Sequence, residues 1–137
     1  MRTPARRTTR RRDRRGVETV ELALSLPILV TILFGTLECC ELLFTKQSIA
    51  VAAYESGRVA ARRDATTEAV TNRFNQIVAA RRLVGATMTL TPGDLSALSI
   101  GEEIRIDVTA PVAENSTSQI VLAALPDLQE TVTFVRE

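Results

Sequence analysis

The sequence predicts an α+β fold in which a long N-terminal transmembrane helix continues into a small outer domain with an antiparallel sheet. Three observations predict this fold. Residues 22–37 form an apolar run without a charge, and small and apolar residues then recur at helical spacing as far as residue 63. Beyond Gly85, apolar and polar residues alternate in three short segments, as they do in strands. A chain of 137 residues has room for one such domain and one membrane segment.

The N-terminal tail, residues 1–16, is strongly basic. It holds eight arginines and one aspartate, whereas the rest of the chain is acidic, so the formal net charge of +1 conceals two different parts. The tail has too little apolar surface to offset the entropy of ordering, and we predict that it is disordered. Arginine clusters suit nucleic-acid phosphates, and they also flank membrane helices on the cytoplasmic side. The apolar run directly behind the tail favours the second role, so no nucleic-acid partner is expected.

The segment that follows the tail is expected to span a membrane. As an α-helix, residues 17–37 would be about 31 Å long, close to the thickness of the bilayer's hydrocarbon core. A helix that is apolar on all sides needs a large protein to hide in, and this chain is too small. The next residues, 38–41, do not fit a signal-peptidase site, so the helix is expected to stay attached with membrane lipid around it. Ser25, Thr31 and Thr36 can return their hydroxyls to the helix backbone.

Glutamates mark both ends of this span. Glu18 and Glu21 lie in the first turns, where the helix N-terminus favours anions. Glu21 also lies at the edge of the hydrocarbon, where an ionisable group is costly, and it is therefore a candidate functional residue. Glu38 and Glu41 at the outer end are interpreted as solvated boundary charges.

Residues 42–63 are expected to continue the helix and to carry a stripe of small residues. Ala52, Ala53 and Gly57 would let another element approach closely. Glycine costs about 1 kcal/mol in a helix relative to alanine, so close packing at Gly57 is the expected compensation. The sequence leaves two partners open for this stripe, namely a neighbouring helix and the chain's own outer domain.

The remaining residues, 64–137, are predicted to form the small α+β domain. A break near residues 64–67 separates it from the long helix. The expected elements then follow in this order: a helix from Glu68 to Leu83 stopped by Gly85, strands over 86–91 and 103–109, a short helix from Ser116 or Thr117 through Leu125, and a strand over 130–135. The predicted organisation is therefore a basic cytoplasmic leader (1–16), a transmembrane helix (17–41), a helical extension (42–63) and an extracytoplasmic domain (64–137).

No catalytic constellation is visible. The absence of histidine excludes histidine-based acid–base chemistry and histidine metal ligation within this chain. There is no glycine-rich phosphate loop and no cysteine, serine or carboxylate cluster with the spacing of a known site. Cys39 and Cys40 are adjacent, which argues against a stapling disulfide and leaves a reactive, lipidated, intermolecular or purely apolar role open. The sequence thus predicts a structural protein without cofactor or metal rather than an enzyme.

Two motifs resemble one family. The sequence RRG (14–16) directly before VETVE (17–21) and LALSLPILVTILFGTLECCELLF resembles the TadE-like proteins, which are minor pilins (pseudopilins) of the tight-adherence (Tad) type IV-related pilus and secretion apparatus. The stretch QSIAVAAYESGRVAARR resembles that family's Ala-rich element, matched here by Ala52, Ala53, Gly57 and Arg58.

This resemblance implies a pilin-like fold and a processing site. In the family, a membrane-embedded prepilin peptidase cuts after a glycine that precedes the apolar helix; carried over, the cut falls between Gly16 and Val17 and removes residues 1–16. Glu21 then becomes the fifth residue of the mature chain, where pilins carry a glutamate. The new α-amino group of Val17 would be cationic near neutral pH, and Glu21 of a neighbouring subunit can pair with it. Val17 stands where major pilins carry phenylalanine.

The function implied by the resemblance is structural: a minor pilin in the assembly of a Tad pilus, and thereby in secretion and adhesion. The implied partners are other pilins, the prepilin peptidase and the inner-membrane assembly platform. The implied location is the bacterial inner membrane, in a single pass with the N-terminus in the cytoplasm, or the pilus itself. The alternative is an unprocessed signal-anchored envelope protein with an outer binding domain. A third reading, a DNA-binding protein, would be soluble without detergent.

Overall fold

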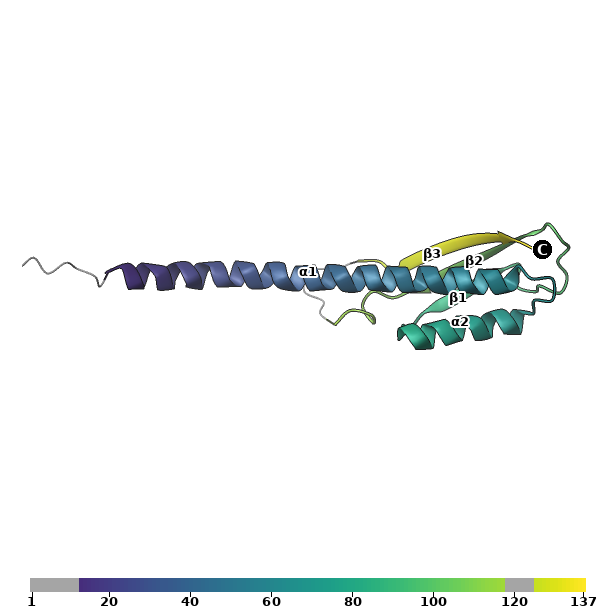
Figure 1. Ribbon diagram of the computed structural model, residues 1–137, viewed down its shortest axis with the longest axis horizontal. Coiled ribbons are helices and arrows are strands. Elements are labelled where there is room, and N and C mark those ends of the chain that lie inside the picture. Colours follow the sequence, from purple (N-terminus) through teal and green to yellow (C-terminus); the bar gives the residue numbers. More distant parts are fainter. Residues whose placement is uncertain (1–12, 118–124) are drawn as a thin grey trace, which may run out of the picture.

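The computed structural model describes residues 13–117 and 125–137, and it confirms the predicted α+β class. The elements, in chain order, are the helices α1 (Asp13–Ala60) and α2 (Thr67–Arg81) and the strands β1 (Thr87–Thr91), β2 (Glu103–Ala110) and β3 (Leu128–Val135). Figure 1 shows α1 as one continuous rod: its N-terminal half projects alone, and its C-terminal half lies against α2 and the sheet. The short helix expected to end at Leu125 falls mainly on residues 118–124, outside the described residues.

The three strands form an antiparallel sheet in the order β1-β2-β3. Thr89 of β1 pairs with Asp107 of β2, and Asp107 pairs with Thr131 of β3, so these three residues lie on one face of the sheet. The neighbours of Asp107 in β2 point to the opposite face. Four alternate residues of β2 are buried, namely Ile104, Ile106, Val108 and Ala110. The opposite face is polar and rich in threonine, as expected for an antiparallel sheet that is solvated on one side.

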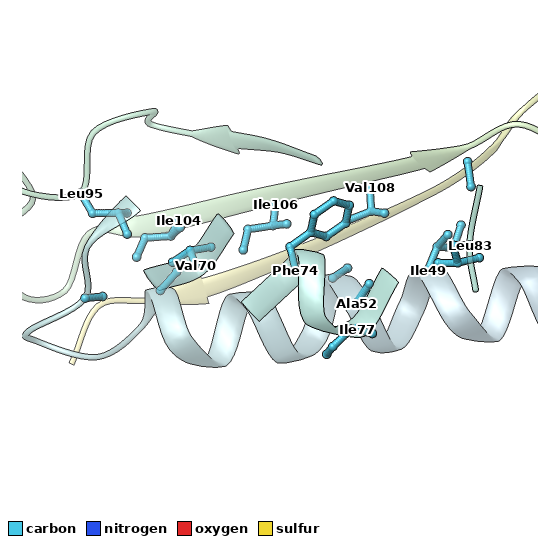
Figure 2. Close-up of a cluster of buried hydrophobic side chains, with 14 residues drawn as sticks. Ile49, Ala52, Val70, Phe74, Ile77, Leu83, Leu95, Ile104, Ile106 and Val108 are labelled. Atoms are coloured by element: carbon cyan, nitrogen blue, oxygen red, sulfur yellow. The ribbon is translucent and has the colours of Figure 1, made fainter. Parts of the chain in front are cut away.

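One hydrophobic layer joins the helices to the sheet. Figure 2 shows side chains of α1, α2 and β2 meeting in this layer, with Val70 and Phe74 of α2 beside Ile106 and Val108 of β2. The layer contains Ile49, Ala52, Ala53 and Ala60 of α1, none of which is exposed. The C-terminal half of α1 is therefore part of the domain core, and it also carries the projecting N-terminal half.

Helix α2 begins at Thr67, one residue before the predicted start, and ends earlier than predicted. The hydroxyl of Thr66 accepts a hydrogen bond from the backbone N–H of Ala69 at 3.1 Å, which makes Thr66 the N-cap. The helix was expected to reach Leu83, but it ends at Arg81 because Arg82 takes the left-handed conformation, with φ 54°. The N–H of Arg82 and the N–H of Leu83 then bond the carbonyls of Ala79 and Val78, as in a glycine-capped helix end.

The end of α1 is fastened by the C-terminus of the chain. The guanidinium of Arg136, which is buried, donates to the carbonyl oxygens of Leu95 and Arg63 at 2.8 and 2.9 Å. The N–H of Glu137 donates to the carbonyl of Ala61 at 2.8 Å. Two of these bonds satisfy the carbonyls of Ala61 and Arg63 in the turn after Ala60, where the helix ends instead of at residue 63.

Gly57 of α1 lies directly against Phe134 of β3. A Cβ atom built on Gly57 would overlap the ring of Phe134, whereas one on Gly16 would meet nothing within 4 Å. The Phe134 ring also packs against Tyr54 with the ring centroids 5.5 Å apart. The absence of a side chain at Gly57 therefore leaves the space on the helix that the ring of Phe134 occupies.

We predict that Gly57→Val destabilises the domain by about 2 kcal/mol, because overpacking outweighs the small gain in helix propensity. Thermal unfolding of the full chain in detergent, followed by circular dichroism, measures the effect. The matched control is Gly16→Val, the same change in the same helix at an open position, which should leave the transition unchanged. Equal transitions for the two variants would contradict the close packing of Phe134.

Candidate subunit-assembly helix

The projecting half of α1 exposes apolar side chains on every side. The exposed large ones from residue 17 to residue 37 are Val17, Val20, Leu22, Leu24, Leu26, Ile28, Leu29, Val30, Ile32, Leu33, Phe34 and Leu37. Within the part of the chain that the structure describes, this is the one helix long and apolar enough to cross a membrane. Such a surface needs lipid or other apolar helices around it.

The hydroxyl groups of this half bond within the helix, as predicted. Ser25 donates to the carbonyl of Leu22 at 3.2 Å. Thr31 donates to the carbonyl of Pro27, and Thr36 to the carbonyl of Ile32, both at 2.8 Å. None of the three hydroxyls therefore needs water, which suits a hydrocarbon environment.

The predicted processing and pairing residues lie at the free end of α1. Gly16, Val17, Glu18 and Glu21 are all exposed. Helix α1 begins at Asp13, so the peptide bond between Gly16 and Val17 is helical. Val17 and Glu21 are separated by four residues and lie on one face of the helix, about 6 Å apart along its axis. Both side chains are open to a second molecule.

The interpretation of Glu38 and Glu41 as solvated charges was wrong. Glu38 is fully buried and Glu41 is half-buried. The carboxylate of Glu41 accepts hydrogen bonds from the backbone N–H of Thr117 at 2.9 Å and the hydroxyl of Ser116 at 3.1 Å. The outer domain folds back over this part of α1 and covers the two glutamates. Sequence periodicity cannot show such a contact, since Glu41 and Thr117 are 76 residues apart.

Covering the glutamates changes the membrane-facing surface of α1. Exposed apolar side chains continue past residue 41, because Leu43 and Phe44 are 59% and 66% exposed. The exposed apolar surface of α1 therefore reaches about two turns beyond Leu37.

The small-residue stripe lies under the chain's own sheet. Ala52 and Ala53 are fully buried, and Gly57 is covered by Phe134. Of the two partners left open by the sequence, the structure brings the outer domain to these three residues. Arg58 instead faces solvent and donates to Glu55 at 2.9 Å.

Glu55 ties α1 to α2. Its carboxylate also accepts a hydrogen bond from the guanidinium of Arg73 in α2 at 2.8 Å. This hydrogen bond, with a smaller contribution from Arg58, lowers the pKa of Glu55 below its ordinary value, and partial desolvation opposes the shift. This pair could not be predicted from the sequence, because its two residues are 18 positions apart and lie on either side of the turn between the helices.

The described residues hold no group of three or more cysteine and acidic side chains placed to bind a metal ion. Cys39 and Cys40 are free and exposed thiols. Helix α1 can therefore contact other molecules through its shape, its exposed apolar surface and the charged groups at its free end.

We predict that Glu55→Gln lowers the melting temperature at about pH 7 and has progressively less effect toward about pH 3. A carboxyl whose folded pKa is depressed stabilises the fold above its ordinary pKa and loses that contribution as the pH falls through the folded value. Thermal unfolding at several pH values measures the difference from the unmodified chain. The control is Glu103→Gln, which changes an exposed carboxylate at the start of β2. A Glu55→Gln effect that is constant with pH would contradict the ion pair.

Comparison with known proteins gives one match. Residues 16–58 match the family model described as TadE-like protein. No curated protein and no solved structure matches the chain. The matched range begins at Gly16 and ends at Arg58, so it contains α1 from Gly16 onward and the small-residue stripe, whereas α2 and the three strands lie outside it. Over these residues, the chain is similar to TadE-like proteins.

Proposed function

We propose that this chain is a minor pilin (pseudopilin) that acts structurally in the assembly of a Tad-type pilus. One observation carries the proposal: the segment that matches the TadE-like family includes the half of α1 that projects from the domain with apolar side chains on all sides. A helix of this kind is suited first to lipid and then to a bundle of similar helices. The role needs no cofactor and no catalytic residue.

In the proposed role, α1 crosses the bacterial inner membrane once. The arginines before Gly16 remain in the cytoplasm, in keeping with the positive-inside rule, and the domain formed by α2 and the sheet lies outside. On assembly, other pilins replace the lipid around the helix, and the inner-membrane platform is the partner that collects the subunits.

Processing by a prepilin peptidase between Gly16 and Val17 prepares the subunit. Both residues are exposed, and the absence of a side chain on Gly16 leaves the bond accessible. The bond is helical in the structure, and glycine weakens a helix by about 1 kcal/mol relative to alanine, which favours local unwinding there. The cut removes the arginine-rich leader and creates a cationic α-amino group on Val17.

The pair between Val17 and Glu21 sets the axial register. When one subunit is shifted by four residues along the helix axis, about 6 Å, its Glu21 comes level with the Val17 α-amino group of its neighbour. Both charges lie where the surroundings become apolar, so each is stabilised by the other. Loss of one partner would leave the other charge poorly solvated, which makes the pair a strong selector of register.

A second candidate function is an unprocessed signal-anchored envelope protein with an outer binding domain. The observation that favours it is the continuous helix from Asp13 through Val17, which holds the bond in a conformation that must unwind before cleavage. In that case the arginine tail is a permanent cytoplasmic flank.

We expect the membrane-extracted chain to begin at Val17 when its host's prepilin peptidase is present and at Met1 when the peptidase is deleted. N-terminal sequencing of the two preparations distinguishes the candidates. Gly16→Val is the matched variant and should keep residues 1–16 in the presence of the peptidase. A Met1 start in both strains would reject the processed pilin and leave the anchored envelope protein.

We expect Glu21→Ala to leave cleavage intact and to reduce the recovery of the chain with other pilins or sheared pili by about tenfold or more, because the register pair is lost. Immunoblots of sheared and cell-bound fractions measure this. The control is Glu18→Ala, which removes another exposed carboxylate from the same end of the helix at a different height along the axis and should assemble normally. Normal assembly of Glu21→Ala would reject the proposed pairing.

A further inference from the structure

The membrane-proximal end of the outer domain presents two neighbouring arginines. Helix α2 lies beside α1 and runs back toward its projecting half, so its C-terminal end is the end nearest the membrane-spanning part (Figure 1). A hollow of about 190 Å³ is lined by Phe44 and Ser48 of α1 together with Arg81 and Arg82. The two arginines therefore lie level with the segment of α1 that directly follows its apolar surface.

The height of this segment above the bilayer follows from the coverage of Glu38 and Glu41. Glu38 is buried, and Glu41 is half-buried and hydrogen-bonded to Thr117 and Ser116, whereas the exposed apolar side chains of α1 continue as far as Phe44. Residues 22–44 are about 35 Å long as a helix, and the hydrocarbon core is about 30 Å thick with a headgroup layer on each side. The level of Phe44 and Ser48 is thus the outer headgroup layer, where phosphate groups lie.

The charges at this level are available for a ligand. Arg81 and Arg82 are exposed, and neither forms an ion pair with a described residue, whereas Arg58, Arg73 and Arg105 all do. The guanidinium group binds phosphate through two parallel hydrogen bonds. The exposed side chain of Val84 beside them adds an apolar contact.

Carboxylates also lie nearby. Glu41, in the same hollow, accepts hydrogen bonds from Thr117 and Ser116. Glu55 lines a second hollow with Arg81 and is paired with Arg73 and Arg58. Glu114 lies against Gly85. Among the described residues that line the first hollow, Arg81 and Arg82 are the cationic ones, and neither forms an ion pair with a described residue.

We propose that Arg81 and Arg82 bind the phosphates of anionic phospholipids in the membrane that α1 crosses, and so hold the outer domain at a defined height and orientation on the bilayer before assembly. This inference rests on the proposed membrane insertion of α1. The competing explanation is that both arginines only complement the dipole at the C-terminal end of α2. That explanation predicts an effect on stability that is independent of lipid composition.

The test uses the full chain in nanodiscs of phosphatidylcholine alone and of phosphatidylcholine with phosphatidylglycerol. Hydrogen exchange of residues 79–86 should slow at least about threefold when the anionic lipid is present. The variant Arg81→Gln/Arg82→Asn should lose this difference, and asparagine tolerates the left-handed conformation of residue 82. The matched control is Arg62→Gln/Arg63→Gln, which changes two adjacent exposed arginines at the opposite end of the domain and should keep the difference.

Hydrogen exchange at residues 22–37 distinguishes failure of the headgroup site from failure of the proposed membrane insertion of α1. Protection of these residues in both lipids with no lipid dependence at 79–86 would overturn the headgroup site while leaving the inserted helix intact. Lack of protection at 22–37 would reject insertion itself. Equal destabilisation of the double variant in both lipids, without a change in lipid-dependent exchange, would assign the arginines to the helix dipole. Protection of 79–86 that requires an added pilin rather than anionic lipid would assign the surface to a protein partner and would also overturn the proposal.

Discussion

The structure depends on one constraint: a single uninterrupted helix projects from the domain with its N-terminal half and is packed into the domain with its C-terminal half. The N-terminal half of α1 is apolar on every side and has no protein around it, whereas the C-terminal half is a member of the domain core. Small residues make the second role possible. Ala52, Ala53 and Gly57 bring the helix backbone close to the sheet, and Phe134 fills the space that a side chain at residue 57 would occupy. The projecting half of α1 is therefore joined to the domain through the packed half of the same helix.

The outer domain contacts α1 at the point where the projecting half of the helix meets its packed half. Glu38 and Glu41 would interrupt the apolar surface if they faced lipid, and the segment ending at Thr117 covers them instead. Farther out, Glu55 joins α1 to α2, and Arg136 fastens the turn after α1 with hydrogen bonds to two carbonyls. Because polar contacts hold both ends of the packed half, displacement of α1 is expected to carry the outer domain with it.

The two halves of the chain relate differently to the family. The match covers residues 16–58, which is the part that a neighbouring subunit, a peptidase or lipid would meet, together with the small residues that seat the domain. The sheet beyond it presents a polar, threonine-rich outer face. The match with the family model therefore rests on α1 and does not extend to the sheet.

Periodicity alone determined the fold class, the continuous helix and the three strands, because these features depend on near neighbours in the chain. The roles of Gly16, Val17 and Glu21 come from the resemblance of a local motif and stay predictions. Only the tertiary structure decided which partner covers the small-residue stripe, that Glu38 is buried and that Arg136 binds two carbonyls. Each of these depends on residues far apart in sequence meeting in space. The end of α2 at Arg81 belongs with them, because Arg82 adopts a left-handed conformation that residue type alone does not favour.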